Sequence, residues 1–219
     1  MLEISNLHVE VGGREVLQGV NLKINDCEIN VLLGPNGSGK TTLLRRTIMG
    51  FMGFGSSRVT SVKIRFNGVD VTEKQVHKQA QAMLGMGIMF QRPPTISGLK
   101  LSKFLTTTTK IDAEQISALA ERIHMTKFLD RDVNAGFSGC EIMQNPSFVM
   151  LDEPESGVDV ENMALLGTAA ASLLEKDQHM INRTKYGLII THTGCYILDY
   201  IKVDVGHVLI DGLMRCSGN

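Results

Sequence analysis

The stretch GPNGSGKT, Gly34 to Thr41, constrains the fold of this chain more than any other feature. It matches the pattern G-x-x-x-x-G-K-[ST] and lies between a short apolar run, EINVLL (28–33), and KTTLLRRTIMG, which has helical character. Glycines let the backbone of such a turn wrap until successive N–H groups converge on one phosphate, and the following helix directs its positive end at the anion. The sequence therefore predicts a strand–loop–helix unit that binds a nucleoside triphosphate.

The residues of this loop have separate predicted tasks. Lys40 is expected to reach the β- and γ-phosphate oxygens, and Thr41 to offer its hydroxyl to Mg²⁺. A glycine-rich turn without a ligand is the alternative, but the strand before the loop and the helix after it favour a binding loop. The predicted contacts to the nucleotide are Gly34, Pro35, Asn36, Gly37, Ser38, Gly39, Lys40, Thr41 and Thr42.

Two carboxylates follow a short apolar run in FVMLDEP, residues 148–154. Open α/β sheets place their ligands at the carboxyl ends of the strands, which is where Asp152 and Glu153 fall. Asp152 is predicted to hold Mg²⁺ through water, and Glu153 to act as the general base that deprotonates the attacking water. Taken alone, the pair is more typical of a solvated strand end, but a phosphate loop in the same chain favours a catalytic pair.

Two further residues are predicted at the ends of parallel strands. Gln91 follows the apolar run GIMF and is expected to ligate Mg²⁺ and sense the γ-phosphate. His192 ends GLIITH and is expected to hydrogen-bond that phosphate in the transition state. A single Gln or His is usually structural, so both predictions depend on this shared strand-end placement. The remaining histidines, at positions 8, 77, 124, 179 and 207, receive no functional prediction.

Alternating apolar residues predict antiparallel strands near both ends of the chain. The first 30 residues form strands around a turn at Gly12-Gly13, and residues 61–71 form another with a turn at Asn67-Gly68. A closing hairpin turns at Asp211-Gly212.

The second half of the chain predicts a parallel sheet. Residues 148–154 and 187–192 are short apolar runs separated by a long helix over about 160–176, a spacing that argues for right-handed crossovers. The middle of the chain is helical, with Asp112 as the N-cap of one helix and Gln115 at its N3 position. The run TTTT at 106–109 is expected to break helical character.

The composition of the chain excludes some classes of function. At 219 residues, with 43% hydrophobic and 21% charged residues, the chain fits one globular domain, and its net charge of −1 gives no field that would attract nucleic acid. The acidic Glu3 near the N-terminus argues against a signal peptide, and the apolar stretch 164–174 is too short to cross a bilayer. We therefore expect a cytoplasmic protein without direct membrane insertion, whose membrane role, if any, comes through a partner.

The cysteines form no pattern typical of a metal site. They are expected to be reduced and mostly buried, and a single ligand to a cluster shared with a partner is the alternative. They lie at positions Cys27, Cys140, Cys195 and Cys216.

Together these motifs resemble those of an ABC-type ATPase over nearly the whole chain. GPNGSGKTT, MFQRPP, FSG, MLDEP, SGVD and ITHTG come in the order of that family. One branch of the family, the SUF-system ATPase (SufC type) and especially its archaeal members, resembles this chain most. The similarity lies in DEPESGVD, THTG, the C-terminal tail and VGGREVLQGVNLKI. The resemblance implies an α/β fold over 1–219: a P-loop (RecA-like) core, an antiparallel β lobe (about 1–33 and 58–72) and a small helical lobe (about 95–140).

The resemblance also implies a dimer. Ser138 and Gly139 would contact the γ-phosphate of ATP bound to a second copy, and Asp159 would communicate across that interface. Val11 falls near the family's adenine-stacking aromatic, which implies weak aliphatic stacking. Energy of hydrolysis would pass through the region around Gln91 to SUF scaffold proteins (SufB/SufD-like) in iron–sulfur cluster assembly.

One segment departs from the family. Nine residues, Gly139 to Ser147, separate Ser138 from Phe148, whereas a three-turn helix alone takes about 11 residues. Residues absent from the sequence and a true deletion are the two explanations, and the retained Asp-Glu pair favours the first. The nucleotide-binding subunit of an ABC membrane transporter and a nucleotide-dependent module without turnover are alternative functions. A DNA-organising ATPase is disfavoured because no stretch could form its long coiled coil.

Overall fold

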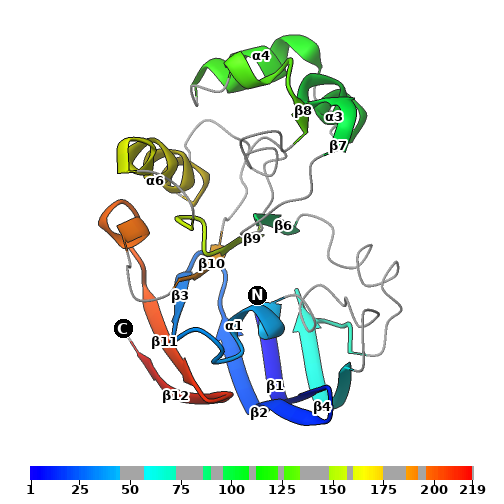
Figure 1. The fold of residues 1–219 in the computed structure, drawn as a ribbon, viewed down its shortest axis with the longest axis vertical. Helices are drawn as coiled ribbons and strands as arrows, with labels where there is room; N and C mark the ends of the chain where they lie inside the picture. The colour runs from blue at the N-terminus through cyan, green and yellow to red at the C-terminus, as the bar shows by residue number, and fades with distance from the viewer. Residues whose placement is uncertain are drawn as a thin grey trace.

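Two sheets, one antiparallel and one mostly parallel, face each other across a shared core (Figure 1). The computed structural model describes residues 1–44, 57–72, 86–89, 96–108, 112–122, 126–133, 148–156, 160–174, 186–191 and 196–218. Within that part of the chain the antiparallel sheet has the strand order β2-β1-β4-β5, and the larger sheet the order β12-β11-β3-β10-β9-β6. The predicted α/β class is thereby confirmed.

The antiparallel sheet comes from the N-terminal part of the chain, as predicted. It consists of β1 (Leu2–Val11), β2 (Arg14–Ile24), β4 (Ser57–Phe66) and β5 (Val69–Asp70). Leu2 and Ile4 are buried on one face of β1, and Leu7 returns to the same face because the register shifts between Ile4 and Leu7. Asn6 has a φ of 51° in this interval, so β1 contains an irregularity that preserves its apolar face.

The larger sheet carries the loop and the carboxylates. Its strands are β3 (Ile29–Leu33), β6 (Met86–Met89), β9 (Phe148–Asp152), β10 (Tyr186–Ile190), β11 (Val205–Ile210) and β12 (Leu213–Gly218). All pair in parallel except β12, which forms the predicted C-terminal hairpin with β11. The strand pairing assigns β3 to this sheet, whereas the lobe bounds implied by the resemblance, about 1–33, include its residues in the antiparallel lobe.

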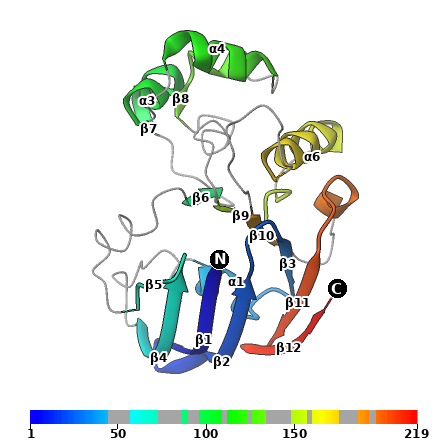
Figure 2. The same cartoon turned by 180° about the vertical axis from the view of Figure 1, so that it is seen from behind.

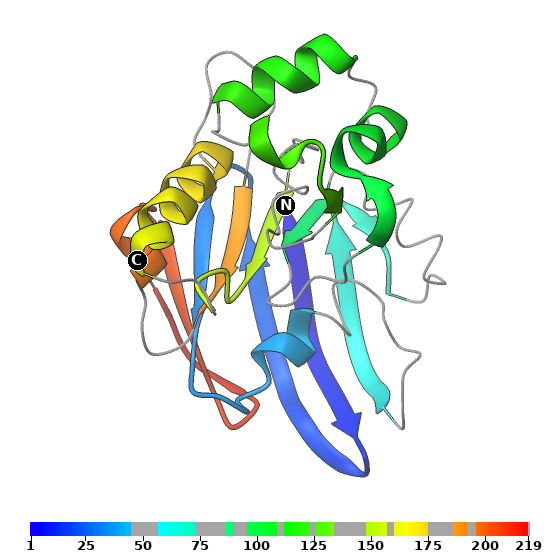
Figure 3. The same cartoon turned by 45° about the horizontal axis from the view of Figure 1, so that its top comes forward.

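Both faces of the larger sheet are covered, which explains its continuous apolar strands. One face packs on α6 (Val160–Leu174), which lies over the sheet in Figure 3. The opposite face packs on the antiparallel sheet, and the two layers can be followed from behind in Figure 2. Along β9, Val149 contributes to the α6 side and Met150 to the other side, as the two-residue period of a strand requires.

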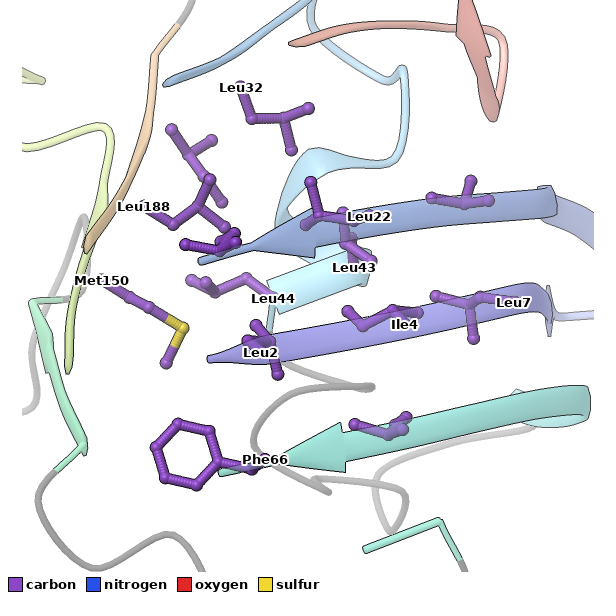
Figure 4. Close-up of a cluster of buried hydrophobic side chains, with 14 of the residues drawn as sticks. Leu2, Ile4, Leu7, Leu22, Leu32, Leu43, Leu44, Phe66, Met150 and Leu188 are labelled. Atoms are coloured by element: carbon purple, nitrogen blue, oxygen red, sulfur yellow. The ribbon is translucent and has the colours of Figure 1, made fainter. Parts of the chain in front are cut away.

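The short helix after the phosphate loop is held between the two sheets. Helix α1 (Lys40–Thr42) is followed directly by Leu43 and Leu44, both fully buried. Figure 4 shows these leucines between strands β1 and β2 on one side and Leu188 and Met150 on the other. The predicted strand–loop–helix unit is thus present over its described residues, 29–44, and it is anchored in the core.

A smaller part, with its helices at the top of Figure 1, contains β7 (Ile96–Lys100), α3 (Leu101–Thr108), α4 (Ala113–Arg122), the 3₁₀ turn η2 (Thr126–Phe128) and β8 (Asp132–Val133). The capping box of α4 is confirmed, since the Gln115 N–H donates to Asp112 Oδ1 at 2.8 Å and the Asp112 N–H to Gln115 Oε1 at 3.2 Å. The expected helix break at 106–109 is wrong for Thr106 to Thr108, which lie inside α3. The Thr106 and Thr107 hydroxyls donate back to the Lys103 carbonyl, so the helix accommodates these β-branched residues.

Two further expectations concern cysteines and membranes. Cys27 is partly exposed and Cys216 exposed, so the expectation of buried cysteines is wrong for this pair, while Cys140 and Cys195 lie outside the described residues. Across the described segments no helix has the length and apolar character needed to span a bilayer.

Candidate nucleotide-binding site

The loop between β3 and α1 is shaped by its glycines. Gly39 has a φ of 105°, and a Cβ at this position would approach Leu17 Cδ2 to 2.6 Å. Gly37 also has a positive φ, of 81°, but an added Cβ there would meet nothing within 4 Å. Glycine is therefore needed at position 39 for both the left-handed backbone and the close contact with Leu17, whereas at position 37 it is needed for the backbone conformation. The loop closes with a hydrogen bond from Ser38 N–H to Pro35 O at 3.2 Å.

Lys40 lies at the centre of the site. Its side chain is 4% exposed, and Nζ donates to the carbonyl oxygens of Gly34 at 2.7 Å and Pro35 at 3.1 Å. Glu153 Oε1 is 3.9 Å from the same nitrogen. Burial lowers the pKa of the Lys40 ammonium, and the negative charges of Glu153 and Asp152 oppose that shift. The Lys40 ammonium thus lies between the carbonyls of the loop and the carboxylates at the carboxyl end of β9.

The two predicted carboxylates emerge at the carboxyl end of β9. Asp152 is 1% exposed and is the last residue of the strand, and Glu153 is 8% exposed. Glu153 has a φ of 49° and its N–H donates to the Ile190 carbonyl of β10 at 2.8 Å. This left-handed backbone turns the chain sharply out of the strand, and the hydrogen bond fixes the turn against the neighbouring strand end.

Sequence reasoning missed one buried acid next to this pair. Glu155 is 6% exposed, and its Oε1 accepts a hydrogen bond from the hydroxyl of Thr191, the residue that follows β10. The second oxygen, Oε2, is buried without a hydrogen-bond partner among the described residues. The carboxylate in DEPES was the available signal, because a third acid so close to a buried strand end needs a partner.

The described donors suit a hard cation held together with phosphate. Asp152 supplies a buried carboxylate, Thr41 a hydroxyl directly after Lys40, and Ser38 Oγ is a buried hydroxyl with no hydrogen-bond partner among the described residues. Mg²⁺ commonly takes one or two protein oxygens and completes its shell with phosphates and water. Across the described segments, no three His, Cys, Asp or Glu side chains come together as a self-sufficient metal site. The donor set therefore fits Mg²⁺ bound jointly with a nucleotide.

The remaining predicted residues are placed as follows. Val11 is the last residue of β1, partly buried, opposite Arg14 of β2 and Ser57 of β4, and it packs against the core between the sheets. Five predicted site residues lie outside the described residues: Gln91, Ser138, Gly139, Asp159 and His192.

In this site a glycine loop connects a core strand to a short helix, and the lysine of the loop faces a carboxylate at the end of a nearby parallel strand. This arrangement defines a P-loop nucleoside triphosphatase. Residues 17–156 match the family described as ABC transporter, so the chain belongs to this family of ATP-binding cassettes. It is accordingly an ABC ATPase that binds ATP and hydrolyses it.

Relatives of similar length support this membership. A probable ABC transporter ATP-binding protein of Streptococcus pyogenes serotype M18 is 31% identical, covering 100% of this chain and 89% of the relative. The probable ATP-dependent transporter ycf16 of Cyanophora paradoxa is 34% identical, covering 100% and 88%, and the vegetative protein 296 of Bacillus subtilis is 33% identical, covering 99% and 86%. The streptococcal alignment extends over 242 positions, more than the 219 residues of this chain, so part of that relative has no counterpart here.

Solved structures share the fold. An ATP-binding subunit of an ABC transporter superposes with a TM-score of 0.77 at 19% identity, covering 100% of this chain and 89% of that one. The ATP-binding cassette MJ0796, in a dimeric post-hydrolysis state bound to ADP and Pi, gives a TM-score of 0.76 at 17% identity, covering 100% and 98%.

Proposed function

We propose that ATP binds with its phosphates in the loop Gly34 to Thr42 and that Lys40 is the residue that holds the β- and γ-phosphates. The position of the Lys40 ammonium carries this proposal: it is buried and donates to two loop carbonyls, which phosphate oxygens can replace as acceptors. The loop amides and the start of α1 supply further donors. The unpartnered Ser38 hydroxyl is an additional donor for the same phosphates. Val11 is proposed to contact the adenine.

We propose that the Mg²⁺ ion is held by Thr41, Asp152 and Gln91. When bound, the ion neutralises charge that develops on the transferred phosphoryl group. The Lys40 ammonium lies close enough to Asp152 for the opposite charges of the two groups to attract.

Glu153 is proposed as the general base. It lies at a strand end 3.9 Å from the lysine that holds the phosphates, and its backbone is fixed by the hydrogen bond to Ile190. His192, which follows the Thr191 bonded to Glu155, is proposed to donate to the γ-phosphate. These assignments predict that Glu153→Gln loses ATP hydrolysis by at least a hundredfold while ATP affinity is retained within about threefold.

A direct experiment compares Glu153→Gln with Glu114→Gln, an exposed carboxylate of α4. Phosphate release and calorimetric ATP binding are measured for both variants and for the parent. Glu153→Gln should be inactive but bind ATP, and Glu114→Gln should match the parent. Unchanged phosphate release in Glu153→Gln would remove this residue from the mechanism, and absent ATP binding in the parent would remove the nucleotide proposal altogether.

We further propose that hydrolysis requires an ATP-dependent homodimer in which Ser138 and Gly139 reach the partner's γ-phosphate and Asp159 lies at the interface. The likeness to a cassette described as dimeric supports this arrangement. In the Glu153→Gln variant, ATP should convert monomer to dimer in size-exclusion chromatography, because the nucleotide is no longer consumed. A variant that binds ATP and stays monomeric would contradict the proposal.

Two partner classes follow from different observations. The names of two relatives, a probable ABC transporter ATP-binding protein and a probable ATP-dependent transporter, favour an ATP-binding subunit that works with membrane permeases. The motifs DEPESGVD and THTG favour a cytoplasmic subunit that works with SUF scaffold proteins (SufB/SufD-like) in iron–sulfur cluster assembly. Affinity purification from detergent-solubilised native cells separates them. Recovery of a permease supports the first class and excludes the second, and recovery of a soluble iron–sulfur scaffold does the reverse.

A further inference from the structure

We infer that the C-terminal hairpin turn at Asp211-Gly212 is a positioning element for the phosphate loop, with Gly212 and Gln18 as the residues responsible. This inference rests on the proposed function of the loop. Figures 1 and 2 show the turn between β11 and β12 beside β2, at the bottom of both views. The turn lies more than 170 positions after the loop in the sequence, so the contact is purely tertiary.

One hydrogen bond joins the turn to the loop. The Gly212 N–H donates to the Ser38 carbonyl at 3.1 Å. The Ser38–Gly39 peptide is trans, and the carbonyl and N–H of a trans peptide point in opposite directions. Holding the Ser38 carbonyl toward the hairpin therefore directs the Gly39 N–H away from the hairpin, toward the side on which the loop amides are proposed to receive phosphate.

Gln18 of β2 also bonds to the turn, through its backbone and its side chain. Its N–H donates to the Gly212 carbonyl at 2.9 Å, and its side-chain Nε2 donates to the Asp211 carbonyl at 3.1 Å. The Gln18 side chain is exposed and makes no contribution to the core, so its bond to the turn is its evident structural role among the described residues.

The fit between these three segments leaves no room for a side chain on Gly212. A Cβ there would lie 2.2 Å from the Val16 carbonyl oxygen and 2.9 Å from its carbonyl carbon, both backbone atoms of β2. A Cβ on Gly34 would similarly approach the Leu209 carbonyl to 2.1 Å. The loop, the hairpin and β2 thus touch through backbone at several points, so any side chain at Gly212 must push the turn away and break its bond to Ser38.

The chain offers a matched control in its other Asx-Gly turn. Gly68, between β4 and β5, has a φ of +80°, close to the +74° of Gly212, but an added Cβ would meet nothing within 4 Å. Gly68→Ala and Gly212→Ala therefore carry the same backbone strain and differ in the clash with Val16. Gln18→Ala is a second test variant that keeps the core intact.

The experiment measures calorimetric ATP affinity and the steady-state KM and kcat for ATP hydrolysis in the parent and the three variants. Gly212→Ala should weaken ATP affinity and raise KM by about fivefold or more, the size expected for one lost hydrogen bond, with kcat at saturating ATP within twofold. Gln18→Ala should raise KM by about two- to fivefold, and Gly68→Ala should change neither constant by more than twofold.

A merely structural role for the turn would lower the unfolding temperature without moving KM. Equal KM values in Gly212→Ala and Gly68→Ala would therefore overturn the inference. If Gly212→Ala does not fold, Gln18→Ala decides, and a parental KM in that variant would overturn the inference equally. A parent that binds no ATP would instead overturn the proposed function of the loop, so the two failures are distinguishable.

Discussion

The hydroxyl of Tyr186 offers a sensitive test of how the two sheets are joined. Tyr186 of β10 is 2% exposed and packs against two rings from different sheets, with ring centroids 4.7 Å from Phe148 and 6.5 Å from Phe66. Its hydroxyl donates to Asn67 Oδ1 at 2.9 Å, in the turn after β4. Burial, together with the negative charge of Asp26, raises the pKa of the Tyr186 hydroxyl to about 12.

The raised pKa gives the stability of the parent a defined pH dependence. The folded chain keeps the Tyr186 proton up to about pH 12, whereas the unfolded chain loses it above pH 10. Between these values the folded state binds more protons, so the free energy of unfolding falls as pH rises, by about 1.4 kcal/mol between neutral pH and pH 11. Tyr186→Phe lacks this titration, but it loses the hydrogen bond to Asn67, at a cost of about 1 kcal/mol.

Urea unfolding of the parent and Tyr186→Phe at pH 7, 9, 10 and 11 measures both effects, and other titrating groups cancel in the difference. The parent should be more stable at pH 7 and 9, and the order should reverse by pH 11. A stability difference that stays constant over the whole range would refute the argument, because it would mean that the hydroxyl is no harder to ionise in the folded chain than in the unfolded one.

Three further predictions concern the phosphate loop and the helical part. Gly39→Ala should lower the free energy of unfolding by about 1–3 kcal/mol more than Gly37→Ala in chemical denaturation, because both strain the backbone but only the first crowds the buried Leu17; equal losses would contradict this. ATP affinity, measured by calorimetry, should fall as pH rises, and the fall should begin below the ordinary lysine pKa of 10.5, because burial lowers the pKa of Lys40 and the ammonium is the form that binds phosphate. The fall should be absent in Lys40→Met. Asp112→Ala should cost about 1 kcal/mol in thermal unfolding through loss of the helix cap, and a loss near zero would show that the cap is energetically silent.

Much of the site framework could be predicted because it is local in sequence. The order strand, glycine loop and helix follows from the apolar run and the motif around Lys40, and the buried strand before Asp152 follows from four consecutive apolar residues. The capping box at Asp112 and the turns at Asn67-Gly68 and Asp211-Gly212 were predictable for the same reason, since each depends on neighbouring residues.

Other features could not be predicted because they depend on contacts between distant segments. The pairing of β3 with β10 and β11 decides which sheet it joins, and no local pattern reports such a pairing. The hydrogen bond between Glu155 and Thr191 forms only when the strands of the sheet are paired. The same holds for the 2.9 Å hydrogen bond between the buried His207 of β11 and Asn30 of β3. The threonines of α3 misled the prediction because helix propensity ignores the hydroxyl bonds made to the preceding turn.

The position of β3 has a consequence for the synthesis of the chain on the ribosome. Both of its neighbours, β10 and β11, lie beyond residue 185, so the strand that carries the phosphate loop has no partner until most of the polypeptide has emerged. Pairing over such a separation is slow, because a long loop must close before any contact is made. A nascent chain should therefore acquire its nucleotide pocket as one of the last steps of folding, and truncation before β10 should abolish that pocket even though the loop sequence itself is complete.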